Sequence, residues 1–200
     1  MIKNVVFDIG NVLTDYTWNK YIHSFGFAEE VCERVAAATV KSKEWAEFDR
    51  GVMSVEAVVE TLVKNDPGIE NEIREFTADM SGLVEKLDYA IPWIQELKAK
   101  GYGVYYLSNF SEKAEKECAH ALDFIPYTDG GILSYRDKMV KPEPEIYKCF
   151  LERYHLKAEE CVFLDDLETN INAARAQGMH GIVFTTREAA VAELEKLGVK

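Results

Sequence analysis

The stretch VVFDIGNVL, residues 5–13, decides the fold of this chain. An apolar run leads directly into a single carboxylate, Asp8, and the small residue Gly10 follows two positions later. A continuous run of valine and phenylalanine indicates a strand buried on both faces, as in a parallel sheet. A carboxylate at the end of such a strand needs a partner, because its removal from water is costly. The sequence therefore predicts a buried first strand that presents Asp8 at its carboxyl end.

Further apolar runs indicate more buried strands, and helical patterns lie between and after them. The predicted strands are NVVFD (4–8), GVYYLS (103–108), CVFLDD (161–166) and GIVFT (181–185). The predicted helices of this part of the chain are 89–101, 111–122, 142–154, 168–178 and 187–198. Strands that alternate with helices in this way form a parallel sheet with right-handed crossovers. The predicted fold class is therefore α/β.

Residues 15–86 interrupt this alternation. They contain no clear strand and three helical patterns, at 28–40, 54–65 and 69–80, and Gly51 after FDR is a helix stop. We therefore expect a helical insert directly after the first strand. The predicted domains are an α/β core of residues 1–14 and 87–200 and an insert of residues 15–86.

Composition restricts the classes of partner and compartment. A net charge of −12 argues against nucleic acid as a partner, although a local metal still permits an anionic small substrate. Four scattered cysteines without a CxxC pair favour a reducing, cytoplasmic setting. No apolar run approaches the ~20 residues of a membrane span, and the N-terminal run is too short for a signal peptide. We expect a cytoplasmic protein without a membrane partner, and the sequence leaves its oligomeric state open.

Polar side chains follow the predicted strands at the edge where α/β sheets bind ligands. Asp8 ends the first strand; the others are Ser108, Asn109, Asp165 and Asp166, with Lys141 at the start of a predicted helix. Taken singly, several have ordinary roles: Asp166 as a helix cap, Ser108 and Asn109 as turn residues, and Lys141 as a surface lysine.

Taken together, these residues predict a more specific site. Three carboxylates at adjacent strand ends repel one another unless a cation lies between them, and oxygen ligands favour a hard ion such as Mg²⁺. Lys141 and the Ser108 hydroxyl add a positive charge and a hydrogen-bond donor beside that ion. Such a site suits a phosphoryl group, with a carboxylate as the nucleophile and the other groups balancing the charge of the phosphoryl oxygens.

Four motifs, in this order, resemble those of the haloacid dehalogenase-like (HAD) superfamily. They are FDIGNVL with Asp8, YLSNF with Ser108, KPEPEIY with Lys141, and VFLDDLETNI with Asp165 and Asp166. The resemblance spans essentially the whole chain and implies a Rossmann-like core with an inserted α-helical cap of subclass I. The motif details are similar to those of bacterial glucose-1-phosphate phosphatases. They imply an Mg²⁺-dependent phosphomonoester hydrolase for a small phosphorylated metabolite, such as a sugar phosphate.

The resemblance also implies the nucleophile and the metal ligands. Asp8 would attack phosphorus and form an aspartyl-phosphate that water hydrolyses. Mg²⁺ would be held by the Asp8 carboxylate, the backbone carbonyl of Gly10 and Asp166. Asp165 would hold a metal-bound water or orient Lys141.

The remaining implied roles concern phosphate binding and support of the acidic pair. Ser108 and the backbone N–H of Asn109 would bind phosphoryl oxygens, and Lys141 would neutralise both the phosphate and the nucleophile. Asn170 would support the acidic pair, with an ordinary helix position as the alternative, and Asn11 is a further candidate for support.

Gly10 departs from a common pattern of the family. Many phosphatases of the superfamily carry a second aspartate at this position as general acid and base, a contribution typically worth ~10²–10⁴-fold in rate. Three interpretations follow. The chain is a phosphatase that works without this residue, a dehalogenase-type hydrolase that attacks carbon, or a catalytically silent ligand-binding or regulatory protein.

The insert offers candidates for substrate contact. Tyr16 and Trp18 follow the first strand at the expected hinge, where they could stack on a sugar face. The stretch KEWAEFDRG (43–51) contains Trp45, Asp49 and Arg50, and a helix end there would also face the site. Trp45 and Arg50 are the candidates for substrate contact in this stretch. For all of these aromatic positions, packing in the core of the insert is the alternative.

Overall fold

The computed structural model describes all 200 residues, and its centre is a parallel sheet of five strands. The strand order is β5-β4-β1-β6-β7, so the first strand of the chain is the middle strand of the sheet. The bounds are β1 Asn4–Phe7, β4 Gly103–Ser108, β5 Gly130–Leu133, β6 Cys161–Asp165 and β7 His180–Val183. The predicted α/β fold with a parallel sheet is confirmed.

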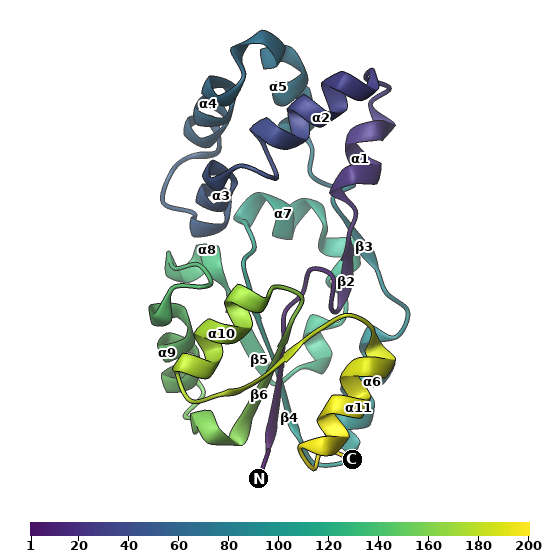
Figure 1. Cartoon of the computed structure of the whole chain (residues 1–200), viewed down its shortest axis with the longest axis vertical. Helices are drawn as coiled ribbons and strands as arrows, with labels where there is room; N and C mark the ends of the chain where they lie inside the picture. Colours follow the sequence, from purple (N-terminus) through teal and green to yellow (C-terminus); the bar gives the residue numbers. More distant parts are fainter.

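Alternate residues of the middle strand pack on opposite faces of the sheet. Val5 and Phe7 belong to the larger apolar cluster, which includes side chains of α6 (Ala90–Ala99) and α11 (Arg187–Lys196). Val6 belongs to a second cluster with α9 (Pro144–Arg153) and α10 (Glu168–Ala176). These helix pairs lie on opposite sides of the sheet (Figure 1). Burial on both faces explains why the strand sequence is continuously apolar.

Strand register brings the predicted site residues to one edge. Phe7 pairs with Tyr106 of β4 and with Leu164 of β6, and the backbone N–H of Asp8 donates to the Leu164 carbonyl at 2.8 Å. The next residues along the three strands therefore emerge side by side.

A helical cap lies beyond this edge of the sheet (Figure 1). Its helices are α1 Trp18–Ser24, α2 Glu29–Ala38, α3 Ala46–Arg50, α4 Val55–Asn65 and α5 Glu70–Ala78, with 3₁₀ turns at Lys43–Trp45 and Pro67–Ile69. The apolar side chains of the cap and of one face of the sheet form a single cluster.

The expectation that residues 15–86 lack strands is wrong at both ends of the segment. β2 (Thr14–Tyr16) and β3 (Val84–Lys86) form a short antiparallel pair where the chain leaves the core and returns to it. Each strand has three residues, too few for a periodic pattern to reveal.

Three further expectations need correction in the second half of the chain. β5 was not predicted, because two of its four residues are glycines, which are depleted in strands. The helix expected at 111–122 ends early, as α7 (Glu112–Glu117), and continues as 3₁₀ turns. Lys141 lies in a loop and not at a helix start, since α9 begins at Pro144. The remaining short helix is α8 (Ser134–Asp137), and further 3₁₀ turns are Ala119–Ala121, Ile125–Tyr127 and Ala158–Glu160.

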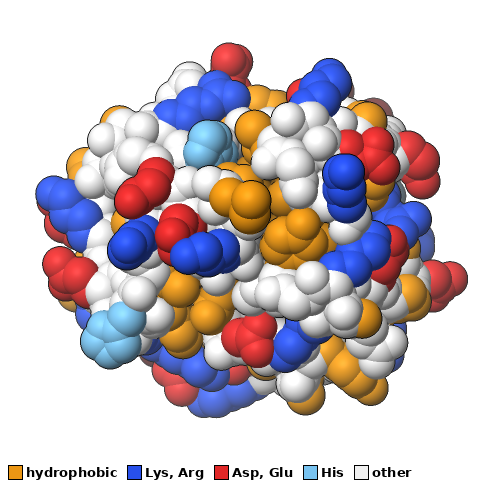
Figure 2. All heavy atoms as spheres, turned by 90° about the horizontal axis from the view of Figure 1, so that it is seen from below, with side chains coloured by type: hydrophobic (Ala, Val, Ile, Leu, Met, Phe, Trp, Pro, Cys, Tyr) orange, Lys and Arg blue, Asp and Glu red, His pale blue; other side chains and the backbone are white.

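The end of the molecule away from the cap has a mixed surface. Figure 2 shows the end of the molecule away from the cap, where acidic and basic side chains are interspersed. None of the helices is both long enough and apolar enough to span a membrane. The four cysteines are free, and three of them are buried.

Candidate active site

The edge of the sheet carries a buried cluster of charges, which we call the floor: Asp8, Lys141 and Asp165. The Lys141 ammonium lies 2.8 Å from Asp8 Oδ1 and 2.6 Å from Asp165 Oδ2. The Lys141 side chain is 1% exposed and that of Asp165 is fully buried. Neighbouring strands supply the two carboxylates, so the strand register fixes their separation.

Both carboxylate oxygens of Asp165 accept hydrogen bonds. The Asn170 amide donates to Oδ1 and Oδ2 at 3.0 Å each, and the backbone N–H of Leu167 donates to Oδ1 at 2.8 Å. Together with Lys141, these contacts leave this carboxylate little freedom. These contacts also fix its position relative to the Lys141 ammonium.

A reciprocal pair of hydrogen bonds places Lys141 although it lies in a loop. The backbone N–H of Lys141 donates to Asn109 Oδ1 at 2.7 Å, and Asn109 Nδ2 donates to the Lys141 carbonyl at 3.0 Å. Asn109 directly follows β4, so the loop is tied to the sheet. The sequence assigned Asn109 only a backbone role, and nothing in the pattern indicates this use of its side chain.

In the floor, burial and the neighbouring charges shift the pKa values in opposite directions. Burial raises the pKa of Asp8 to about 6, although Lys141 acts to lower it. Burial alone would lower the pKa of Lys141, but the two carboxylates raise it above its ordinary value, so the lysine stays charged. The cluster contains two acidic groups and one basic group.

The donor set at this edge fits a hard divalent cation. Asp8, Asp165 and Asp166 each present a carboxylate oxygen within 4.8 Å of the others, and no sulfur or imidazole takes part. Asp166 Oδ2 accepts a hydrogen bond from Asn11 Nδ2 at 2.8 Å, which orients the more accessible member of the pair. Oxygen donors with excess negative charge are the environment that Mg²⁺ prefers.

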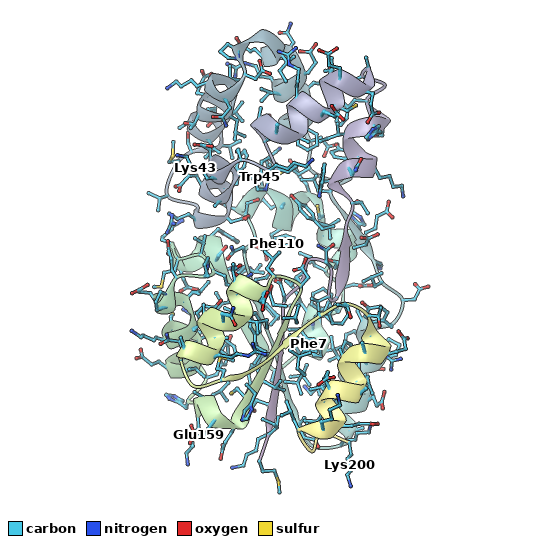
Figure 3. All side chains as sticks on the ribbon, in the orientation of Figure 1. Phe7, Lys43, Trp45, Phe110, Glu159 and Lys200 are labelled. Carbon is cyan, nitrogen blue, oxygen red and sulfur yellow. The ribbon has the colours of Figure 1, made fainter.

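A cavity of about 310 Å³ opens above the floor and reaches the cap. It is lined by polar residues of the sheet edge and by a largely apolar roof. The lining residues that the sequence predicted are Asp8, Gly10, Asn11, Tyr16, Trp45, Ser108, Asn109, Lys141, Asp166 and Asn170. Figure 3 shows Trp45 at the lower side of the cap and Phe110 below it at the top of the core, and both line this cavity.

Two of the predicted substrate contacts lie outside the cavity wall. Trp18 packs against the apolar cluster, with the Lys41 ammonium 5.0 Å from its ring centroid. Arg50 donates two hydrogen bonds to Glu143, from Nη1 at 3.0 Å and from Nη2 at 2.6 Å. We do not carry either residue forward as a substrate contact.

The cavity contains one carboxylate, Asp49, to which the sequence assigned no role although its stretch was expected to face the site. Asp49 of α3 is half-buried in the cavity wall, and its side chain forms no hydrogen bond or ion pair within the protein. Burial raises its pKa to about 7. The helix stop at Gly51 was the available signal that a helix end would lie here.

Gly10 does not adopt the left-handed backbone conformation in the loop after β1. The left-handed residue of this loop is Asn11, with φ of 57°. A Cβ atom built on Gly10 would lie 3.9 Å from Tyr16 Cβ, an ordinary contact. The backbone therefore does not require glycine at position 10.

The chain belongs to the haloacid dehalogenase-like hydrolases, since the model of that family matches residues 2–178. The predicted superfamily is thus confirmed. The chain is 27% identical over 198 residues to the sesquiterpene phosphatase AstK of Aspergillus oryzae, covering 98% of this chain and 96% of that protein. It is 28% identical over 188 residues to the D-ribitol-5-phosphate phosphatase of Bacteroides thetaiotaomicron, covering 89% of each.

A solved structure has the same fold over nearly the whole chain. A HAD family enzyme from Bacteroides thetaiotaomicron, in complex with magnesium and inorganic phosphate, superposes with a TM-score of 0.70 at 21% identity. The match covers 94% of this chain and 96% of the other. At this identity it establishes the shared fold.

Proposed function

We propose that this protein is an Mg²⁺-dependent phosphomonoester hydrolase that acts on a small phosphorylated metabolite, such as a sugar phosphate. The observation that supports this most directly is the floor, where a buried lysine bridges a potential nucleophile and a fixed carboxylate. Two relatives over most of the chain are named phosphatases, one of them for a sugar-alcohol phosphate.

The roles of the floor follow from its contacts. Asp8 Oδ1 accepts from the Ile9 N–H at 2.7 Å and from Lys141, so Oδ2 is engaged by neither of them and is placed to attack phosphorus. Attack forms an aspartyl-phosphate and releases the alcohol, and hydrolysis then releases phosphate. Lys141 and Ser108 stabilise the negative charge of the phosphoryl oxygens during both transfers.

The metal would be held by Asp8, Asp166 and the Gly10 carbonyl. When bound, it would neutralise phosphoryl oxygens and screen the carboxylates from one another. Asp165 contributes indirectly, because both of its oxygens already accept hydrogen bonds from Lys141, Asn170 and the Leu167 N–H. Asn11 would fix the carboxylate of Asp166.

We also propose the domain boundaries predicted from the sequence, with a core of residues 1–14 and 87–200 and a cap of residues 15–86. The antiparallel pair β2–β3 supports this division, because it spans both crossings between the two parts. Closure of the cap about these crossings would exclude water while the ester is bound.

The test is phosphate release from p-nitrophenyl phosphate and a panel of sugar phosphates, with Mg²⁺ and with EDTA. We expect turnover that needs Mg²⁺ and that Asp8→Asn abolishes. The exposed Asp88 provides the matched control variant, Asp88→Asn. Dechlorination of 2-chloropropionate without metal and without phosphatase activity would establish a dehalogenase instead. Binding of Mg²⁺ or a phosphate analogue with no turnover at all would establish a silent binder.

A further inference from the structure

Asp49 is the only acidic residue that the cap contributes to the cavity wall. Most buried or half-buried carboxylates in proteins are paired, whereas this side chain has no partner within the chain. The rest of the roof near it is apolar or aromatic, including Trp45 and Phe48. An unpaired carboxylate in such a wall is available to a ligand.

Contacts with the core fix the backbone around Asp49. The Ser134 hydroxyl donates to the Asp49 carbonyl at 2.6 Å, and the Lys138 ammonium donates to the Gly51 carbonyl at 2.5 Å. The adjacent Arg50 is paired with Glu143. We call these contacts the latch, and they hold the short helix α3 against the core.

Gly51 allows this close approach. It has φ of 64°, and a Cβ on it would lie 2.9 Å from Tyr135 Cβ of α8. A side chain here would both strain the backbone and push α3 away from the core. Glycine at position 51 thus permits α3 to pack closely against α8.

The direction of phosphoryl transfer then decides what Asp49 can reach. In-line displacement places the nucleophile and the leaving oxygen on opposite sides of phosphorus. Asp8 attacks from the floor, so the leaving oxygen points toward the cap. Asp49 lies on that side of the cavity, where Gly10 offers no side chain to carry a proton.

We propose that Asp49 is the general acid and base of this enzyme, an inference that rests on the phosphatase function proposed above. As Asp8 bonds to phosphorus and the ester P–O bond breaks, the Asp49 carboxylic acid gives its proton to the leaving oxygen, and the alcohol departs. A water then attacks the aspartyl-phosphate and gives a proton to the Asp49 carboxylate. The bond between phosphorus and Asp8 breaks, phosphate leaves, and both side chains return to their starting state.

The environment of Asp49 suits this cycle. Burial raises its pKa to about 7, the attraction of Lys141 lowers it, and repulsion by Asp8 raises it. General acid–base catalysis is most effective when the pKa of the group lies near the working pH. A metal beside Asp8 would lower this pKa and a phosphate dianion would raise it. The charged or titratable groups around the carboxylate and α3 are Asp8, Lys141, Tyr16, Glu47, Tyr135, Lys138 and the Arg50–Glu143 pair.

The test compares two esters of similar shape, p-nitrophenyl phosphate and phenyl phosphate. The nitrophenolate leaves readily without a proton, whereas phenolate benefits from an acid. We expect Asp49→Asn to lower kcat/KM for phenyl phosphate by about 10²–10⁴-fold and for p-nitrophenyl phosphate by less than about tenfold. We also expect Asp49→Glu to retain more activity on phenyl phosphate than Asp49→Asn.

Asp49→Ser is a second variant in case the amide disturbs the fold, and Glu75→Gln, an exposed cap position, is the control. The melting temperature of each variant is measured alongside its kinetics. A Cβ at position 10 would make only an ordinary contact. We therefore expect the double variant Gly10→Asp/Asp49→Asn to have a kcat/KM for phenyl phosphate at least about tenfold above that of Asp49→Asn.

Equal losses of kcat/KM for the two esters in Asp49→Asn would overturn the proposal, since they would mark a residue that only binds substrate or supports the fold. This outcome differs from failure of the phosphatase function itself. In that case the wild-type protein would release phosphate from neither ester.

Discussion

The floor and the roof of the cavity hold their carboxylates in opposite ways. In the floor, Asp8 and Asp165 share the Lys141 ammonium, and strand register sets their positions. In the roof, Asp49 has no charged partner, and a five-residue helix carries it. The floor carboxylates are buried and paired with Lys141, so their positions are fixed. The unpaired carboxylate of Asp49 is free to exchange a proton. The following predictions test this contrast.

The largest effect is expected from the floor. Lys141→Met would leave two buried carboxylates without their cation, and removal of one partner of a buried pair costs about 3–5 kcal/mol of unfolding free energy. It would also lower kcat by about 10²–10³-fold, because a preorganised charge at the phosphoryl group is lost. Urea unfolding and phosphatase assays measure both effects.

Lys148→Met is the matched control, because Lys148 is exposed and forms no ion pair. If the two variants unfolded at the same urea concentration, the ion pairs of the floor would contribute nothing to stability. The proposed difference between the floor and the roof would then be wrong.

A smaller effect is expected from the latch. Arg50→Met and Glu143→Gln each break the bidentate pair between α3 and the core, and a loss of about 1 kcal/mol in cap docking corresponds to a roughly fivefold rise in KM. The double variant should be no worse than either single variant, since both remove the same interaction. If Arg50 instead bound substrate directly, Glu143→Gln would leave KM unchanged or improve it. Steady-state kinetics on the best sugar phosphate decide between these.

The smallest effect concerns stability and pH. Because the pKa of Asp49 is raised from 3.8 to about 7 in the folded protein, the folded state binds more protons than the unfolded state between these values. The free energy of unfolding therefore falls as pH rises through this window, and the loss is complete above it. Asp49→Asn has no carboxyl group to ionise at this position, so its free energy of unfolding does not fall in this way. In EDTA, we expect the variant to melt a few degrees above the wild type at pH 8 and at the same temperature near pH 3, at roughly 2–4 °C per kcal/mol.

Thermal unfolding of the metal-free protein at several pH values measures the difference between the two proteins. A constant difference across the range would contradict a raised pKa at Asp49. Glu75→Gln, whose exposed carboxylate has no partner, should follow the wild type throughout.

Two of the three floor residues, Asp8 and Asp165, were predictable because they lie at strand ends. A buried strand has a strong sequence pattern, and parallel strands end at one edge, so Asp8, Ser108 and Asp165 were expected together. The hydrogen bonds between the Asn109 side chain and the Lys141 backbone were not predictable, since they join loops about thirty residues apart. The same holds for the Arg50–Glu143 pair, in which a charge expected at the substrate instead ties the cap to the core.

The sequence by itself determined the α/β class, the helical insert and the identity of the residues at the strand ends. These features depend on local periodicity and on the fixed geometry of a parallel sheet. Only the tertiary structure decided which cap residues reach the cavity, because that depends on how α3 docks against α8 and not on any pattern within the cap. It also showed that the backbone does not need glycine at position 10, and that the unpaired carboxylate of the cavity comes from the opposite wall.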